Sequence, residues 1–494
     1  MRTRPAGWQL GALLAMQAAL YFWNLGLLSP WTDEANILRI ATMPFQEGFR
    51  AVTADVHPPL YFFLLFLWLR LPLGLEPAVE ARALSVILAL ASTVAVDRLW
   101  ARQLTTRARA WYLALWTLSP CLLLYARMCR SYSLQVLLAV LTAAAIMEFA
   151  KKTTLRGAAA LSACLASTLY THYVPGLAFW AAANIVLLRQ RRVRDAAATD
   201  AIVAIACAPW LWYLARSLGA WVSHPAGYAV TGTPLRELPV KLAYWSVSFV
   251  MGEAVLDAVL FLGAVSIPLI AILVMTGARA SLELARIAVP AALIGFIGVS
   301  RWVSYPFIPA RMLYVFPLFL LLLISGAMVH RRTGDITLTI MLVISITGVW
   351  CYFHKVGFRN KQYPMPMREI AALIERNSAE TAGILVDATN SDPPALAYWL
   401  SPEREVLRTD DRQASAAVAR LLGDPRARTI WFLRNTHDVS AARLDEQFEG
   451  QLRAAMPAKV YWYEPFSALE TGLMRAMGMR DPPRYFHELL QFQR

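Results

Sequence analysis

Blocks of apolar residues, separated by short polar segments, recur along the chain from residue 8 to residue 353. Most blocks approach the roughly 20 residues that an α-helix needs to cross a bilayer. The first block, Trp8–Leu28, follows a short basic start and carries no small-residue cleavage site, so we interpret it as an uncleaved span. The pattern predicts a polytopic α-helical membrane protein with about eleven spans in residues 1–353.

Basic residues between the apolar blocks predict the orientation of the chain. They form six clusters: Arg2 with Arg4, Arg98–Arg109, Lys151–Arg156, Arg189–Arg194, Arg279–Arg286 and His330–Arg332. Each cluster lies two spans from the next, and Lys and Arg accumulate in cytoplasmic loops. The N-terminus is therefore expected inside. The outer segments are then residues 30–80, the turns near 126–131 and 171–174, residues 219–253, the turn near 303–310 and everything after residue 354.

One apolar run, Leu60–Leu71, does not fit this alternation. A full crossing here would invert every later loop, and the run is shorter than the roughly 20 residues of a spanning helix. We therefore predict an interfacial or re-entrant helix on the outer face, within a first outer loop of residues 30–80.

From about Phe358 onward polar and charged residues become frequent, and short helical and strand patterns alternate. The predicted helices are Met367–Asn377, Pro394–Leu400, Gln413–Leu422 and Ala441–Ala455, and the predicted strands are Ile384–Asp387, Thr429–Leu433 and Val460–Tyr463. This alternation indicates a small α/β domain in residues 354–494 on the outer face. We assign it no catalytic role.

Composition agrees with a membrane protein and removes one class of partner. The chain is 58% hydrophobic and only 16% charged, against about a quarter charged residues in soluble domains. The net charge of +14 would suggest nucleic acid in a soluble protein. Here it is a topology signal, so we expect no nucleic-acid partner. The five cysteines show no metal-site or disulfide spacing.

The first outer segment carries the densest candidate chemistry. Asp33 and Glu34 follow directly on the first span, and His57 precedes Pro58 and Pro59. A carboxylate beside a membrane can accept a proton from an acceptor hydroxyl. The proline pair fixes a turn that would present His57 at headgroup depth, where an imidazolium can meet a phosphate.

These motifs, taken in order, resemble the protein O-mannosyltransferase superfamily of GT-C glycosyltransferases, which includes the enzyme that adds aminoarabinose to lipid A. The matching elements are Asp33-Glu34, Pro58-Pro59-Leu60-Tyr61, Arg82 at the start of the next span, Tyr125-Ala126-Arg127-Met128-Cys129-Arg130-Ser131-Tyr132, Thr171-His172-Tyr173, and Arg311-Met312-Leu313-Tyr314 before Pro317. The resemblance covers about residues 8–353.

The resemblance implies a polyprenyl-phosphate sugar as donor and an inverting transfer to a hydroxyl on the outer, periplasmic face of a bacterial inner membrane. Asp33 is then expected as the base and Glu34 as its support. His57, Arg311 and Tyr314 would bind the donor phosphate. The residues expected to line the cavity are Arg82, Arg127, Arg130, Tyr132, His172 and Tyr173. The acceptor is a glycolipid, a polysaccharide or a protein. Relatives often carry an acidic residue near Arg127–Tyr132 that is missing here, so we predict no metal cofactor and leave the use of a divalent metal open.

Alternatives remain at this stage. A polyprenyl-lipid flippase or transporter without transferase chemistry also explains many spans and buried charge, although we find no inverted repeat. A different membrane transferase, such as a polysaccharide polymerase or ligase, is a third possibility. Arg82 and Arg311 also fit a structural interpretation as charges at span ends.

Overall fold

The computed structural model describes residues 7–54, 57–222, 238–302, 309–378, 382–387, 393–409, 414–424, 428–436, 442–476 and 479–494. The chain divides into two compact units. The first, Met1–Leu25 with Ile37–Val356, is here named the membrane unit, and the second, Gly26–Asn36 with Gly357–Arg494, the C-terminal unit. The segment Gly26–Asn36 therefore groups with residues more than 300 positions away, which the apolar pattern does not indicate.

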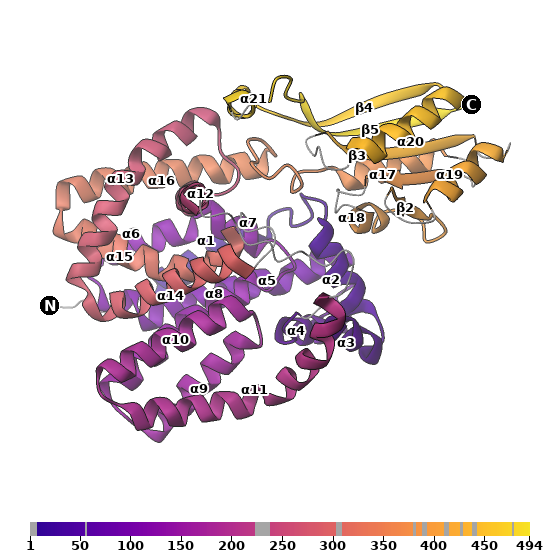
Figure 1. The fold of residues 1–494 in the computed structure, drawn as a ribbon. Coiled ribbons are helices and arrows are strands. Elements are labelled where there is room, and N and C mark those ends of the chain that lie inside the picture. The colour runs from indigo at the N-terminus through magenta and orange to yellow at the C-terminus, as the bar shows by residue number, and fades with distance from the viewer. Residues whose placement is uncertain are drawn as a thin grey trace. The chain divides into compact units, whose positions relative to one another are not determined.

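The regular elements described in the membrane unit are helices (Figure 1). Outside residues 32–68, its helices are α1 (Gly7–Phe22), α5 (Pro77–Leu99), α6 (Thr106–Thr117), α7 (Pro120–Ala126), α8 (Tyr132–Lys151), α9 (Leu155–Leu169), α10 (Tyr173–Arg189), α11 (Val193–Val222), α12 (Leu238–Met251), α13 (Asp257–Ala280), α14 (Leu282–Trp302), α15 (Phe316–Val329) and α16 (Arg331–Phe353), with 3₁₀ turns η1 (Ala101–Gln103) and η3 (Pro309–Val315).

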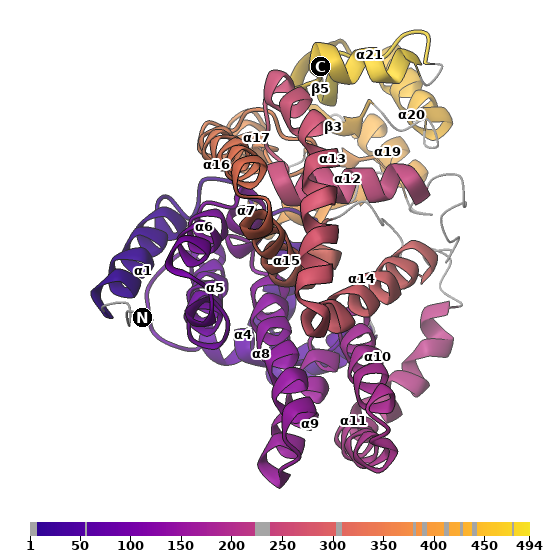
Figure 2. The same cartoon turned by 90° about the vertical axis from the view of Figure 1, so that its left-hand side faces the viewer.

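Seven stretches of the described chain are long and apolar enough to cross a membrane, and three shorter apolar helices accompany them. The seven are Pro77–Gln103, Tyr132–Lys151, Val193–Ser217, Asp257–Ala280, Leu282–Ser300, Pro309–Val329 and Arg331–Phe353. The protein is therefore a multi-pass membrane protein, and the number of about eleven spans stays a prediction. Among the packed pairs, α9 lies beside both α10 and α11 (Figure 2).

Local chemistry explains where several of these helices begin. Glu76 caps α5 by accepting hydrogen bonds from the backbone N–H groups of Ala78 and Val79, and Pro77 is the first helical residue. Proline suits this position because its missing N–H would have no partner in the helix. Ser119 caps α7 in the same way, with Pro120 following. Pro120 also separates α6 from α7, so this apolar block is broken rather than continuous.

The segment predicted to be the first outer loop contains three short helices, α2 (Thr32–Thr42), α3 (Phe45–Ala54) and α4 (Leu60–Trp68). At about 1.5 Å per residue, α4 is far shorter than a bilayer core is thick, as predicted for the Leu60–Leu71 run. The guanidinium of Arg70 donates to the carbonyls of Ala41, Phe66 and Met43, which ties the end of α4 to the end of α2.

The C-terminal unit contains a mixed sheet whose described strands follow the order β2-β1-β3-β5-β4. The strands are β1 (Gly383–Val386), β2 (Val406–Arg408), β3 (Thr429–Asn435), β4 (Ala458–Pro465) and β5 (Tyr485–Gln493), and the helices are α17 (Met367–Arg376), α18 (Pro393–Ala397), α19 (Ala414–Gly423), α20 (Ala442–Ala455) and α21 (Ala468–Ala476). β1 pairs with β2 and β3 in parallel, whereas β5 runs antiparallel to both β3 and β4.

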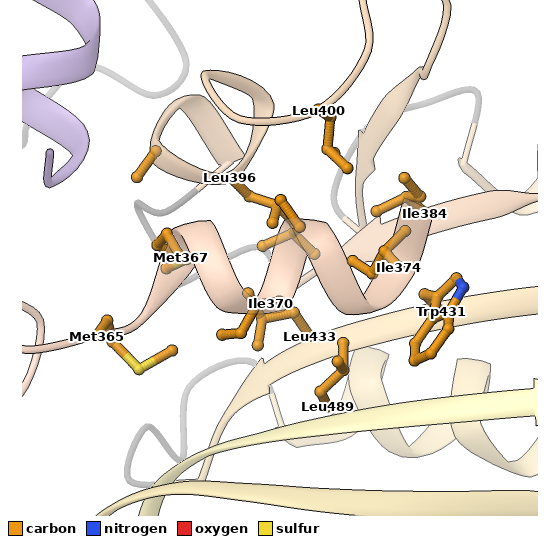
Figure 3. Packing of buried hydrophobic residues seen from close by; sticks show 13 residues of the cluster. Met365, Met367, Ile370, Ile374, Ile384, Leu396, Leu400, Trp431, Leu433 and Leu489 are labelled. Carbon is orange, nitrogen blue, oxygen red and sulfur yellow. The ribbon is translucent and has the colours of Figure 1, made fainter. Parts of the chain in front are cut away.

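Alternate residues along the strands face opposite layers of helices, as the period of two requires. Ile384, Trp431 and Leu489 pack against α17 and α18 (Figure 3). Leu385 and Phe432 point the other way, toward α19 and α20. The strands predicted near residues 384, 430 and 460 are confirmed, and so are the four predicted helices, within one to three residues at their ends. β2, α21 and β5 were not predicted.

Candidate active site

Hydrogen bonds around the start of α4 join segments that are far apart in the sequence. The backbone N–H of Leu60 donates to the carbonyl of Tyr170 at 2.9 Å, which ties α4 to the turn between α9 and α10. The hydroxyls of Tyr61 and Ser85 are 2.9 Å apart, and Ser85 Oγ donates to the carbonyl of Arg130 at 3.5 Å. The start of α4 is therefore fixed against α5, the α7–α8 turn and the α9–α10 turn.

Four basic side chains of the membrane unit gather at these turns, and we name them the basic cluster: His57, Arg130, His172 and Arg311. Burial, together with the charges of Arg311, His57 and Arg130, lowers the pKa of His172 to about 3. Arg311, His57 and Arg130 therefore each lie close enough to His172 to act on its imidazole. His57 is exposed, and the other three are half-buried. The cluster is thus partly exposed and carries guanidinium groups, which bind phosphate well.

His172 caps α10, and this cap defines its hydrogen-bonding state. Its Nδ1 accepts a hydrogen bond from the backbone N–H of Val174 at 3.2 Å. With a pKa near 3 the ring is neutral at physiological pH, so its single proton lies on Nε2. His172 therefore offers an N–H donor to a ligand and adds no charge to the cluster.

The two carboxylates of the first outer segment belong to the C-terminal unit. Asp33 and Glu34 lie in the first turn of α2, where the helix dipole favours negative charge. Asp33 is half-buried, whereas Glu34 is only 1% exposed. Of the two, Asp33 is the one that a ligand can reach.

Two arginines predicted to line the cavity are instead buried among protein groups. Arg127 is 2% exposed and donates to four backbone carbonyls, those of Leu20, Tyr21, Trp23 and Asn24, and to the hydroxyl of Tyr352. Arg82, also 2% exposed, donates from Nη1 to the carbonyl of Leu25 at 3.1 Å. These contacts favour a structural role for both, at the end of the first span.

The tyrosines differ in the same way. Tyr314 is fully buried, donates its hydroxyl to the carbonyl of Ala291 at 2.9 Å and packs on Phe179, which favours a packing role over phosphate binding. Tyr132 is 5% exposed and packs edge-on against Tyr125. Tyr173 is half-buried, and its hydroxyl accepts a hydrogen bond from the indole of Trp210 at 2.9 Å.

The sequence analysis assigned no role to three polar residues that make buried hydrogen bonds in the structure. The hydrogen bond between Tyr61 and Ser85 holds the start of α4. Ser85 could have been noticed in the sequence, because it lies three residues after Arg82 and therefore one helical turn away from it. Glu253, in the connection between α12 and α13, is 2% exposed and accepts hydrogen bonds from Tyr244 and Ser248, both at 2.7 Å. Glu253 belongs to no motif in the sequence, so its burial could not be predicted.

Metal ligands do not gather in the part of the chain that the structure describes. Within those ranges, no group of three or more His, Cys, Asp or Glu side chains could hold an ion. The free cysteines Cys121, Cys129, Cys164, Cys207 and Cys351 are all at least partly buried.

Neither the protein-family models nor the curated proteins include a match to this sequence. Solved structures do match. The crystal structure of ArnT from Cupriavidus metallidurans bound to undecaprenyl phosphate superposes with a TM-score of 0.57 at 12% identity, covering 99% of this chain and 98% of that one. Apo ArnT gives 0.56 at 13% identity, with 98% of each chain covered.

The mycobacterial arabinofuranosyltransferase AftD matches with a TM-score of 0.50 at 17% identity, over all of this chain and 40% of its own. At such identities the likeness concerns the fold. Because the match to ArnT extends over nearly all of both chains, it includes the C-terminal residues as well as the helices. The resemblance inferred from the ordered motifs is confirmed at this level: the chain is a polytopic membrane protein with the GT-C glycosyltransferase fold.

Proposed function

We propose that this protein is a membrane glycosyltransferase that moves a sugar from a polyprenyl-phosphate donor to a hydroxyl group of an acceptor on the outer face of the membrane. The observation that carries the proposal is the basic cluster, in which four separate segments of a membrane-embedded chain supply His57, Arg130, His172 and Arg311. Charge beside a membrane is costly and is retained where it has a function.

The basic cluster is the proposed site for the donor phosphate. Arg130 and Arg311 supply fixed positive charge, and His172 supplies a neutral Nε2–H donor. Support for a lipid phosphate comes from the fold, because ArnT with the same fold has been solved with undecaprenyl phosphate. As the bond from sugar to phosphate breaks, negative charge grows on the phosphate oxygen that leaves. Donors already aimed at that oxygen stabilise it without reorganisation.

Asp33 is the proposed base, a role that the resemblance implies. It would take the proton of the acceptor hydroxyl while that oxygen attacks the anomeric carbon from the side opposite the phosphate. One carbon–oxygen bond forms, the bond to the phosphate oxygen breaks, and polyprenyl phosphate leaves with the electron pair. The anomeric configuration inverts. Glu34, almost fully buried in the same helical turn, is proposed to support the loop.

The proposed orientation places the basic cluster on the outer face of a bacterial inner membrane. Its members lie at the α3–α4, α7–α8 and α9–α10 connections and in η3, whereas the Lys- and Arg-rich clusters lie at the alternate connections, such as those between α8 and α9 and between α10 and α11. The positive-inside rule then puts the second set in the cytoplasm.

The test is the release of polyprenyl phosphate by the purified protein in nanodiscs, from a mixed pool of polyprenyl-phosphate sugars, with and without an acceptor extract of the cell envelope. We expect release that requires the acceptor and that falls by about 10² to 10⁴-fold in Asp33→Asn, because general base catalysis contributes that much. Mass spectrometry of the consumed donor identifies the sugar.

Two arginine variants complete the design. Arg130→Gln should weaken donor binding, whereas Arg286→Gln, an exposed arginine of the predicted inner set, should bind donor like the wild type. A folded protein that binds the donor lipid but leaves it intact in every condition would contradict the proposal and favour a flippase. The acceptor class, whether glycolipid, polysaccharide or protein, follows from fractionating the extract.

A further inference from the structure

Ser29 caps a helix whose second residue lies 339 residues later in the chain. Its Oγ accepts a hydrogen bond from the backbone N–H of Arg368, the second residue of α17, at 3.3 Å. The first amides of a helix have no carbonyl partner within it. Pro366, which precedes α17, has no side-chain acceptor to offer. Ser29 therefore takes the part that a capping residue normally plays from within the same segment.

A second contact holds the same loop two residues further on. The rings of Trp31 and Tyr363 meet edge to face, with centroids 5.4 Å apart and planes at 81°. Trp31 is 7% exposed and Tyr363 2%. The indole N–H of Trp31 has no hydrogen-bond acceptor among the described residues, so packing of the ring is what holds this side chain.

Trp31 is also the residue from which α2 begins. Its carbonyl accepts the hydrogen bond of Ala35 N–H at 2.9 Å, the first of the helix. Asp33 is the second residue of α2 and Glu34 the third. A displaced Trp31 would therefore move the start of the helix and both carboxylates with it.

We propose that the C-terminal unit is a positioning element for the transfer reaction, in which Ser29 and Trp31, anchored on α17 and Tyr363, fix the place of Asp33. This inference rests on the proposed function, since it needs Asp33 to be the base. In this proposal the α/β part of the C-terminal unit contributes to catalysis by holding the loop that carries Asp33, and not through reacting side chains of its own. Ser29 and Trp31 are positioning residues, because they act through the helix that carries the carboxylate.

The variants come in matched pairs. Trp31→Ala removes the ring, and Trp31→Phe keeps an aromatic ring while losing an N–H that donates no hydrogen bond within the described residues. Ser29→Ala removes the acceptor for Arg368, and Ser29→Asp keeps one, since aspartate caps helices as well as serine does. All four are made in the full-length protein in nanodiscs, with folding checked by thermal melting.

Two readouts separate positioning from a loss of fold. Hydrogen exchange of the peptide that covers residues 29–36 should become faster in Trp31→Ala and Ser29→Ala, and stay near wild type in the paired variants. In the transfer assay, kcat of Trp31→Ala should fall by about 10 to 100-fold, the cost of a base misplaced by about 1 Å. KM for the polyprenyl-phosphate donor should stay within about twofold, because the basic cluster is untouched.

Exchange in residues 29–36 that is the same in Trp31→Ala and wild type overturns the anchoring, and an unchanged kcat overturns the positioning role. If Trp31→Ala does not fold, the milder serine pair decides both points by the same criteria. A wild type that consumes no donor disproves the proposed function instead. The exchange measurement then still decides whether the C-terminal unit holds residues 29–36.

Discussion

Arg127 and Arg130 lie three residues apart in one turn, yet their surroundings give them different tasks. Arg127 is buried, and its guanidinium is surrounded by the carbonyls at the end of the first span. Arg130 is half-buried and acts electrostatically on His172. The sequence motif contains both arginines and assigns them alike, because residue type alone does not tell a saturated guanidinium from an accessible one.

Replacement of either arginine by glutamine should separate these tasks. Arg127→Gln leaves several buried carbonyls without a donor, at about 1 to 3 kcal/mol each, so we expect a large drop in melting temperature. Arg130→Gln should melt like the wild type but bind donor roughly 10 to 100-fold more weakly, since a charge-assisted hydrogen bond contributes about 1.5 to 3 kcal/mol. Thermal melting and donor binding in nanodiscs measure the two effects. Equal melting temperatures for both variants would contradict the assignment.

His172 makes a prediction about pH. Its pKa is about 3 in the folded protein, against 6.5 for an unperturbed histidine. Between these values the unfolded chain binds a proton that the folded chain does not, so this residue lowers stability as pH falls from 6.5 toward 3. His172→Gln should therefore lose less melting temperature than the wild type between pH 8 and pH 5. A larger loss in the variant would show that His172 takes up its proton in the folded state.

At the scale of elements, α4 owes its place to polar contacts at its first turn rather than to its length. The nine-residue helix is bound through Leu60 N–H to the α9–α10 turn and through Tyr61 to Ser85 on α5. Ser85 also donates to the carbonyl of Arg130, and in the hydrogen bond between Tyr61 and Ser85 either hydroxyl can be the donor. The contact thus links the segment of His57 to that of Arg130.

A double-mutant cycle tests this link. Tyr61→Phe and Ser85→Ala each remove one hydroxyl. The loss of donor-binding free energy in the double variant should be smaller than the sum of the losses in the two single variants, by a coupling energy of about 1 kcal/mol. The measurement is the donor dissociation constant of the four proteins. Strict additivity would mean that the two hydroxyls act independently of each other.

Periodicity predicted the elements whose pattern is local and left out those whose signal is ambiguous. α17 alternates apolar and polar residues with a helical period, and β3 begins with the apolar run of residues 430–433, so both could be read directly. β5, with the sequence YFHELLQFQ, mixes polar and apolar residues without a clear period, and its pairing with β3 and β4 supplies the order that the segment lacks by itself. No local pattern predicts the contact of Ser29 with Arg368.

At the scale of the whole molecule, the chain joins a helical membrane unit to an α/β unit of ordinary soluble chemistry, and Gly26–Asn36 belongs to the second. The membrane class and the fold could be predicted because the length and hydropathy of the apolar blocks and the order of the motifs lie in the sequence itself, whereas the orientation stays a prediction from the positive-inside rule. The division that assigns the carboxylate pair to the C-terminal unit and the basic cluster to the membrane unit could not be predicted, because it depends on which distant residues pack together.

This division predicts how activity responds to urea. A soluble α/β unit should unfold at urea concentrations that leave bilayer-embedded helices intact, since units of a protein open with separate free energies. Transfer should then disappear with the near-ultraviolet signal of the C-terminal unit, while donor binding and most helical circular dichroism remain. Transfer that outlasts this transition would contradict the positioning role.

The hydrogen bond between Ser29 and Arg368 also means that residues 29–36 can be anchored only late in biosynthesis. Translation proceeds at about 5 to 20 residues per second, so the 339 residues between the two partners take roughly 20 to 70 seconds to make. During that time a nascent chain already inserted in the membrane holds Asp33 on an unanchored loop. The sheet needs β5 before β4 has a partner, which delays the finished unit further. Incompletely synthesised chains would therefore bind the lipid donor without a positioned base, and so would not transfer its sugar to water.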